Sequence, residues 1–400
     1  GMLLLNQLRF SGYRSFRGLL PMPGRDEPPN ELPLRRLTLI IGKNGAGKSQ
    51  AARLLHQVLG SLREPGNPLF VSQVGGRVMA NEDKDNFFDL NPVAHPVEVS
   101  LKWQLDGVPG SLGFVISKHQ VTDDHLSVFS WRLAQGGDVA QGAEGQDEPL
   151  PWAAEPWATV LAELQRLGAR SEALQGTRRR LTRTYRPPNT RTLRPPLGID
   201  GENAPDWLAR SPTLLDRTRE WMAEHLPPTN FDLDTSQGEL RLIERLHGGP
   251  LNLADAAEGV QHVLPVITLL CARASEPPAQ RVDSIEQPEL HLHDAMHGAL
   301  ADLLLDAVGL GASAPVTDVG QRLLVETHSE GVLLRVRRRI AEGKVNPDDV
   351  GLCYVDRDDR GSTLRPIKID HKGDLSWWPY GVFLERLEDA KAIAVARRSR

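Results

Sequence analysis

A glycine-rich segment at residues 42–49, with the sequence GKNGAGKS, carries the residue types that bind phosphate groups. Its glycines let the backbone curl until several N–H groups point inward at an anion. Lys48 can reach the β- and γ-phosphate oxygens of a nucleoside triphosphate, and the Ser49 hydroxyl can ligate Mg²⁺. The segment therefore predicts a site for ATP with Mg²⁺. The residues expected to contact the nucleotide are Asn44, Gly45, Ala46, Gly47, Lys48, Ser49 and Gln50.

The flanking residues predict the elements that position this loop. Residues 37–41 (LTLII) form a short, wholly apolar run, which is typical of a strand buried on both faces. After the loop, apolar residues at helical spacing over 54–62 predict a helix, whose positive end would face the bound anion. Strand, loop and helix in this order favour a phosphate-binding loop over a chance glycine-rich turn.

A second acidic segment lies at residues 282–289 (VDSIEQPE). A phosphate loop of this kind needs a carboxylate at the end of a neighbouring strand to hold Mg²⁺. Glu286 stands where the strand ends, because Pro288 stops it, so we assign Glu286 to the Mg²⁺ site together with Ser49. Asp283 lies inside the strand, and its side chain is expected to point elsewhere. The alternative interpretation is a solvated acidic turn.

Residues 324–329 (LVETHS) predict a further strand with a polar tip, followed by a helix that Ser329 can cap. His328, at the tip, can donate a hydrogen bond to a γ-phosphate and so sense its presence. A lone histidine is more often structural than functional. Its position after a buried strand and downstream of the acidic segment favours the functional role here.

The rest of the chain predicts an α/β protein. We expect a first strand near residues 3–10, antiparallel strands between 97 and 133, a flexible loop at 135–151 and a helix near 157–167. After residue 239 the pattern predicts alternating strands and helices again, ending in a strand pair near 350–370.

These segments, in this order, resemble the ABC-type ATPases related to RecF, SMC and the OLD family. They resemble more closely the predicted AAA-type ATPases that lack a long coiled coil. The segments that carry the resemblance are residues 10–16, 41–49, 285–293 and 325–329, with softer matches at 198–202 and 378–383.

The resemblance implies one ABC-type ATPase domain over residues 1–400, a P-loop NTPase with a RecA-like parallel core. Residues 1–133 would hold the N-terminal strands, the phosphate loop and an antiparallel β subdomain. Residues 134–238 would form an insertion with helices and an arginine-rich segment. Residues 239–400 would supply the signature segment, the acidic strand and the histidine tip.

The resemblance also implies that ATP is bound between two subunits, so we expect an ATP-dependent homodimer. Arg14 and Ser15 would approach the nucleotide, and His328 matches the family's switch histidine. Glu258 and Gly259 belong to the signature segment, which contacts the γ-phosphate bound to the partner subunit. In this chain Ala257 replaces the usual serine of that segment, so dimer-linked catalysis is expected to be weakened.

Gln287 occupies the position of the family's catalytic glutamate. A glutamine cannot act as a general base, so turnover is expected to be slow or to use Glu289 instead. Glu289, His291 and His293 could also be interpreted as a metal cluster. The resemblance favours a loop that crosses to the other subunit over a metal site.

Seven arginines crowd into one segment without an acidic residue between them: Arg178, Arg179, Arg180, Arg183, Arg186, Arg191 and Arg194. Such a segment could contact the phosphates of a nucleic acid. It could equally be a solvated loop, because the net charge of −5 gives no general attraction to nucleic acid.

Three functions stay open. The first is an ATPase whose dimer closure acts on nucleic acid or a protein partner, and the second is an ATP-gated scaffold that signals to an effector protein with little hydrolysis. An OLD-like nuclease ranks lowest, because only about 70 residues follow His328 and a further catalytic domain needs more. Two cysteines and no apolar run near the roughly 20 residues of a membrane span predict a soluble, cytoplasmic protein.

Overall fold

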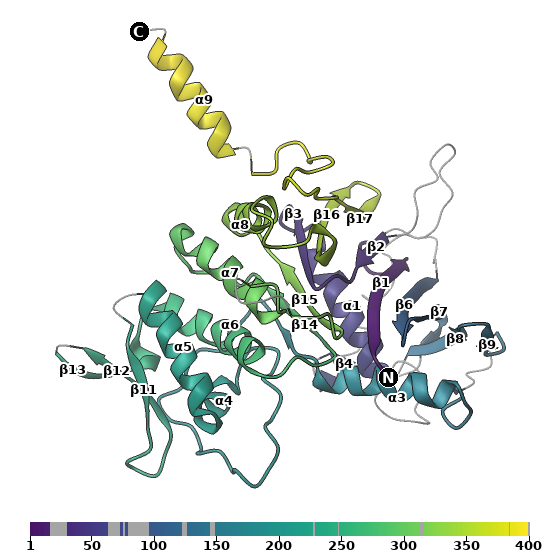
Figure 1. Cartoon of the computed structure of the whole chain (residues 1–400), viewed down its shortest axis with the longest axis horizontal. Coiled ribbons are helices and arrows are strands. Elements are labelled where there is room, and N and C mark those ends of the chain that lie inside the picture. The colour runs from purple at the N-terminus through teal and green to yellow at the C-terminus, as the bar shows by residue number, and fades with distance from the viewer. Residues whose placement is uncertain are drawn as a thin grey trace.

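Two six-stranded sheets and the helices around them make up the computed structural model (Figure 1). It describes residues 1–16, 30–62, 73–74, 77–78, 96–121, 126–144, 149–226, 229–246, 248–311, 316–383 and 385–398. In Figure 1 one sheet lies at the centre and the second to its right, while helices and a small sheet fill the lower left.

The central sheet has the strand order β10-β14-β15-β3-β16-β17. Its first five strands are parallel, and β17 pairs with β16 in the antiparallel sense. The strands are β3 (Leu37–Gly42), β10 (Ala173–Leu174), β14 (Arg281–Glu286), β15 (Gln321–Glu326), β16 (Val350–Asp358) and β17 (Gly361–Pro366). This mainly parallel sheet, packed against helices, confirms the predicted α/β fold class.

Alternate residues of β3 pack into two different cores, which explains its uninterrupted apolar sequence. Leu37, Leu39 and Ile41 belong to the core formed with the helices of the C-terminal half, whereas Ile40 belongs to the core beneath the second sheet. The helices of the C-terminal half that pack against Leu37, Leu39 and Ile41 are α6 (Glu258–Ser275), α7 (His297–Ala307) and α8 (Glu330–Ala341). On the other side lie α1 (Lys48–Ser61) and α3 (Trp157–Arg170).

The second sheet is antiparallel, with the order β2-β1-β6-β7-β8-β9. Its strands are β1 (Leu3–Ser11), β2 (Asn30–Pro33), β6 (Val97–Leu105), β7 (Val108–Val121), β8 (Leu126–Gln135) and β9 (Asp138–Gln141). Buried and more exposed residues alternate along β6, as expected for a sheet with one face on a core. This is the predicted N-terminal antiparallel β subdomain.

A helical insertion packs against α6 at the lower left of Figure 1. It contains α4 (Ala204–Arg210), α5 (Pro212–His225) and the small sheet of β11 (Phe231–Asp234), β12 (Arg241–Leu246) and β13 (Gly249–Asn252). The remaining elements are the strand pair β4 (Gln73–Val74) and β5 (Arg77–Val78), the single-turn 3-10 helices η1 (Leu253–Asp255), η2 (Asp294–Met296) and η3 (Pro347–Asp349), and α9 (Glu385–Arg398). No helix in the described part of the chain is long and apolar enough to span a membrane.

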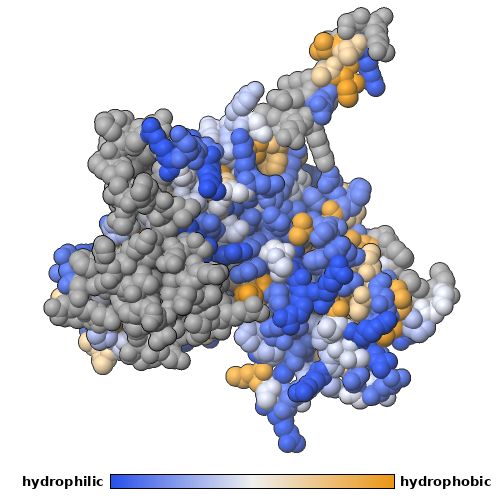
Figure 2. Space-filling view, turned by 180° about the vertical axis from the view of Figure 1, so that it is seen from behind, coloured by the Kyte–Doolittle hydropathy of each residue, from blue (hydrophilic) through white to orange (hydrophobic). Residues whose placement is uncertain are grey.

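The last helix, α9, extends away from the body of the protein (Figure 1). In the view from behind, the described surface is mostly hydrophilic and apolar residues appear in small groups, one of them on α9 (Figure 2). Ile393 and Val395 of α9 are both more than half exposed. This helix was not predicted from the sequence.

One other expectation was wrong. The segment at 135–151 is not a loop throughout, since β9 pairs with β8 within it. The helices α4 and α5 lie within 134–238, where helices were expected without bounds; Pro205 and Pro212 occupy their first turns, where a missing N–H is tolerated.

A buried ion pair fixes α6 against β14. Arg273 Nε lies 2.7 Å from Asp283 Oδ2, and Arg273 Nη2 lies 3.2 Å from Asp283 Oδ1. The two side chains are only 4% and 2% exposed. Asp283 Oδ1 also accepts the backbone N–H of Glu172 at 2.8 Å. Asp283 therefore has a structural role inside the strand, as its position in the sequence indicated.

The buried carboxyl group of Glu172 should make the stability of the fold depend on pH. Burial, reinforced by the nearby charge of Asp283, raises the pKa of Glu172 from 4.5 to about 7. The folded protein then binds this proton more tightly than the unfolded chain, so stability should fall as the pH rises from about 4.5 to about 7. Glu172→Gln keeps an acceptor for the N–H of Leu197, which donates to Glu172 Oε2 at 3.1 Å.

We expect Glu172→Gln to be more stable than the wild type by about 2 kcal/mol at about pH 8, with little difference at about pH 4.5. Urea unfolding at both pH values measures the difference. Equal pH dependence in the two proteins would contradict the raised pKa of Glu172.

Candidate nucleotide-binding site

The glycine-rich loop lies between β3 and α1, at the carboxyl end of the central sheet. Gly45 and Gly47 have φ angles of 75° and 97°, in the left-handed region that favours glycine. A Cβ on Gly47 would also lie 2.8 Å from Ser15 Oγ, so a larger residue does not fit. The first turn of α1 contains no acidic residue, so its positive end is not neutralised there. These features make the loop a concave anion site.

Lys48 lies folded inside this loop. Its Nζ donates to the carbonyl oxygens of Gly42 at 2.9 Å and Lys43 at 2.8 Å. Burial lowers the pKa of Lys48, while the carboxylates of Glu326 and Glu289 act in the opposite direction. The ammonium group therefore lies between loop carbonyls and two nearby carboxylates.

The carboxylate of Glu326, the last residue of β15, lies near the hydroxyl of Ser49. Burial raises the pKa of Glu326, while the Ser49 hydroxyl acts in the opposite direction, and Glu326 Oε2 has no hydrogen-bond partner among the residues that the structure describes. Glu326 was not singled out in the sequence. A signal for it was present, because β14 and β15 both end in glutamate, and Glu286 and Glu326 are paired in register.

Glu286 belongs to the same group of side chains but already has close partners. Arg53 Nε lies 2.6 Å from Glu286 Oε1 and Arg53 Nη2 lies 2.8 Å from Glu286 Oε2. The N–H of Gly176 donates to the same Oε2 at 3.0 Å. Arg53 was not singled out in the sequence, although it stands one helical turn after Ser49. The bidentate pair satisfies the carboxylate that had been assigned to Mg²⁺.

Glu289 lies deeply buried beside the histidine tip. Its Oε1 accepts the backbone N–H of His328 at 2.7 Å. Burial raises the pKa of Glu289, and its Oε2 has no partner in the described part of the chain. Glu289 therefore offers a free carboxylate oxygen close to Lys48.

His328 follows β15 at the wall of a cavity of about 500 Å³. Burial, with a smaller contribution from the positive charge of Lys48, lowers the pKa of His328. The cavity is also lined by Lys43 and Asn44 of the loop and by the C-terminal residues 381–383. Ser329 caps α8 as expected, since its Oγ accepts the N–H of Val332 at 3.0 Å. The cavity thus joins the phosphate loop, His328 and the tail of the chain.

Gln287 has a φ angle of 48°, which is unusual for a residue other than glycine. Its N–H donates to the carbonyl of Glu326 at 2.8 Å, so it links the ends of β14 and β15. The guanidinium of Arg178 donates to the carbonyl oxygens of both Glu286 and Gln287. Arg178 is buried, and burial lowers its pKa to about 10. Arg178 supports the turn after β14.

The arginine-rich segment is largely occupied by contacts within the chain. Besides the buried Arg178, ion pairs join Arg179 to Asp200 and Glu202, Arg180 to Glu258, Arg183 to Asp255, and Arg194 to Glu276. Each of these acidic partners lies outside the segment, so the composition of the segment does not reveal them. Of the seven arginines that could form either a strip for nucleic acid or a solvated loop, Arg178 is therefore buried and four others have acidic partners within the chain.

Ser15 and Gln50 lie against the loop. Ser15 Oγ donates to Gln50 Oε1 at 3.0 Å, and Ser362 Oγ donates to the carbonyl of Ala46 at 2.6 Å. Arg14, with a φ angle of 51°, has its guanidinium 5.7 Å from the ring centre of Tyr13. The N-terminal residues and β17 thus brace the loop from outside.

The signature segment begins α6. Ala257 is the N-cap residue and provides no side-chain cap, while Glu258 is exposed in the first turn. A Cβ on Gly259 would lie 2.8 Å from the carbonyl oxygen of His291, so the helix and the loop after β14 are in close contact. His262 was not expected near His291 from the sequence, but the fold brings His262 of α6 to His291.

Comparison with known proteins gives matches at the level of the fold. A family model described as "Protein of unknown function (DUF3696)" matches residues 345–391, and no curated protein matches the chain. The SMC head domain from Thermotoga maritima matches 92% of this chain and 100% of that chain at 12% identity, with a TM-score of 0.44.

The Smc head domain bound to the C-terminal domain of ScpA from Pyrococcus furiosus matches 99% of this chain and 100% of that chain at 12% identity, with a TM-score of 0.48. A bacterial Atm1-family ABC exporter with ATP bound matches 99% of this chain and 42% of that chain at 10% identity, with a TM-score of 0.35. Identities and TM-scores this low assign neither residues nor substrates to this chain.

Proposed function

We propose that this chain binds ATP with Mg²⁺ through residues 42–49 and hydrolyses it. The observation that carries the proposal is the buried group at the carboxyl end of the central sheet. There Lys48 and Ser49 meet Glu326, whose Oε2 has no partner among the described residues. A buried carboxylate oxygen without a partner is costly, and a cation would satisfy it.

The residues present fit a magnesium nucleotide. Ser49 and Glu326 would hold the ion, and Glu286 could join them if Arg53 released its carboxylate. Mg²⁺ would neutralise charge on the β- and γ-phosphate oxygens. The loop N–H groups and the dipole of α1 would bind the phosphates, and Lys48 would exchange its two carbonyl partners for phosphate oxygens.

Glu289 is the proposed general base. Its buried carboxylate has one oxygen fixed by the N–H of His328 and one oxygen free to accept a proton from water. The His328 ring, at the cavity wall, would contact the terminal phosphate. Gln287 would have a positioning role through its hydrogen bond to Glu326.

We also propose that ATP joins two copies of the chain, as in the RecF, SMC and OLD-like ATPases that the sequence resembles. Ala257 and Glu258 are exposed at the start of α6, and residues 43–45 of the phosphate loop are exposed as well. Two surfaces on one chain are therefore open to a second copy. Any work on nucleic acid or an effector protein would follow from this closure.

Lys48→Ala tests the nucleotide site. We expect ATP affinity to fall by at least about tenfold and phosphate release to fall to background, because the charge opposite the γ-phosphate is lost. Isothermal titration with a non-hydrolysable ATP analogue and a phosphate-release assay measure the two effects.

Lys102→Ala is the matched control for Lys48→Ala. Lys102 is an exposed lysine of β6 and lies outside the proposed site. It should keep ATP binding within about threefold of the wild type. Phosphate release that survives in Lys48→Ala would show that the activity arises at another site.

A scaffold that binds ATP and hardly hydrolyses it is the second candidate function. The observation that favours it is the bidentate Arg53–Glu286 pair, beside a glutamine at position 287. The ion pair occupies the carboxylate of Glu286, and glutamine at position 287 has no carboxylate to act as a base. ATP binding that depends on Lys48 without measurable phosphate release in the wild type would select this alternative.

A further inference from the structure

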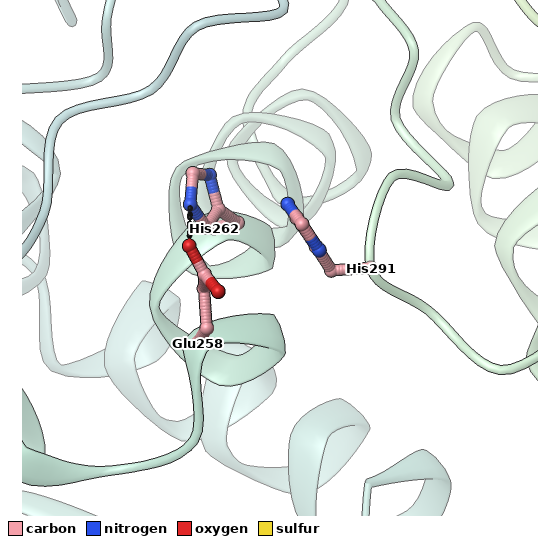
Figure 3. A group of neighbouring side chains, drawn as sticks. All are labelled: Glu258, His262 and His291. Atoms are coloured by element: carbon pink, nitrogen blue, oxygen red, sulfur yellow. Dashed lines mark ion pairs between the residues drawn. The ribbon is translucent and has the colours of Figure 1, made fainter.

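Three side chains of types that can ligate a metal lie together, outside the group around Lys48. Glu258 and His262 lie one turn apart on α6, and His291 lies on the loop after β14 (Figure 3). One ligand atom from each residue lies within 4.8 Å of the others. In Figure 3 the ring of His291 points from its loop toward the helix. The fold thus assembles a group from parts of the chain that are about 30 residues apart in sequence.

The distances in this group suit ligands of one ion better than a hydrogen bond. Glu258 Oε1 lies 3.4 Å from His262 Nε2, whereas charge-assisted hydrogen bonds are typically about 2.7–2.9 Å. Two tetrahedral ligands, each about 2.0–2.1 Å from zinc, lie about 3.3–3.4 Å apart. The rings of His262 and His291 have centroids 4.6 Å apart with a 38° tilt, so a small shift of the His291 ring would bring its nitrogen to the same ion.

The backbone holds His291 in place for this role. Its φ angle of 65° is unusual for a side chain with a Cβ and carries a conformational cost. Its carbonyl lies so close to α6 that only glycine fits at position 259. A strained residue held firmly against a helix is a feature that proteins keep at binding sites.

The surroundings compete little for these side chains. His262 Nδ1, the ring nitrogen that is not paired with Glu258, is buried and has no hydrogen-bond partner among the residues described, so none of them holds the ring away from the site. Glu258 Oε1 has one competing partner, Arg180 Nη2 at 3.4 Å, and both side chains are more than half exposed. An exposed ion pair contributes little free energy, so a divalent ion can displace the guanidinium.

We propose that Glu258, His262 and His291 bind a divalent transition-metal ion of the zinc class, with water completing the coordination. Two imidazoles and one carboxylate are ligands that zinc prefers, whereas Mg²⁺ prefers oxygen ligands. The ion would tie the start of α6 to the loop that carries Glu286 and Glu289. The proposal does not depend on ATP binding, so each can fail without the other.

The test is calorimetric titration of ZnCl₂ into the metal-free, untagged full chain without nucleotide. We expect one zinc ion per chain. His291→Asn and His262→Gln should each weaken zinc binding by more than about tenfold, since loss of even a supporting residue costs that much. Asparagine tolerates the left-handed backbone at position 291, and glutamine is close in size to histidine at position 262.

His293→Asn is the matched control, because it makes the same substitution two residues further along. His293 Nδ1 accepts the N–H of Ala295 at 3.2 Å, and asparagine preserves such a cap. Zinc binding should be unchanged in this variant. Cobalt titration adds an independent readout, since tetrahedral Co²⁺ absorbs strongly in the visible range. Absence of zinc binding in the wild type, or binding that both ligand variants retain, would overturn the proposal.

Discussion

Glu289→Gln should lower the rate of phosphate release by about 10²- to 10⁴-fold while leaving ATP affinity close to that of the wild type. Glutamine can still accept the N–H of His328, so the local structure should persist. It cannot accept a proton from water, which is the role assigned to the free Oε2 of Glu289. Single-turnover phosphate release and equilibrium binding of an ATP analogue separate the two effects.

Glu239→Gln serves as the control for this substitution, because Glu239 is an exposed glutamate with no part in the proposed site. Its rate should match the wild type. If Glu289→Gln releases phosphate at the wild-type rate, proton transfer does not pass through Glu289. Loss of both binding and release would mean instead that Glu289 acts by holding the site together.

Arg273→Met should lower the free energy of unfolding by about 3–5 kcal/mol, because it leaves Asp283 buried without its cation. The pair is almost inaccessible to water, and Asp283 lies in the middle of β14. Urea denaturation measures the loss. Adding Asp283→Leu should recover part of it, since the second substitution removes the unpaired charge.

Arg166→Met provides the comparison for an exposed pair. Arg166 lies 3.0 Å from Glu163 on α3, but its side chain is 58% exposed. We expect a loss of less than about 1 kcal/mol. Similar losses for Arg273→Met and Arg166→Met would show that burial of the Arg273–Asp283 pair does not determine its contribution.

The place of the glycine-rich loop between a buried strand and a helix could be predicted because its information is local. The glycines, Lys48 and Ser49 are contiguous, and the apolar run before them indicates a buried parallel strand. The same holds for Ser329, which caps a helix that starts at the next residue. The fold class followed from the strands and helices around these points, whose order along the chain defines a parallel core.

The partners within the site could not be predicted, because they depend on strand order and register. Glu326 reaches Ser49 only because β15 lies between β14 and β3, with Glu326 paired to Ile40. Arg53 and Glu286 are separated by 233 residues in the chain. A motif of either segment alone contains no information about such pairs.

The contacts of the arginine-rich segment could not be predicted for a related reason. Its composition suggested a free basic surface, but composition does not reveal acidic residues that fold onto it from other segments. Arg178 shows the limit most clearly, since a residue interpreted as a surface cation is buried behind β14. His262 likewise lies next to His291 only because α6 packs against the loop after β14.

The most direct test of the central claim is a crystal structure with a non-hydrolysable ATP analogue and Mn²⁺, located by its anomalous scattering. We predict the triphosphate along the N–H groups of residues 42–49, and Mn²⁺ shared by Ser49 and Glu326. Lys48 Nζ should have left the carbonyl oxygens of Gly42 and Lys43 for the phosphates. A nucleotide bound elsewhere, or a manganese ion out of reach of both Ser49 and Glu326, would contradict the account.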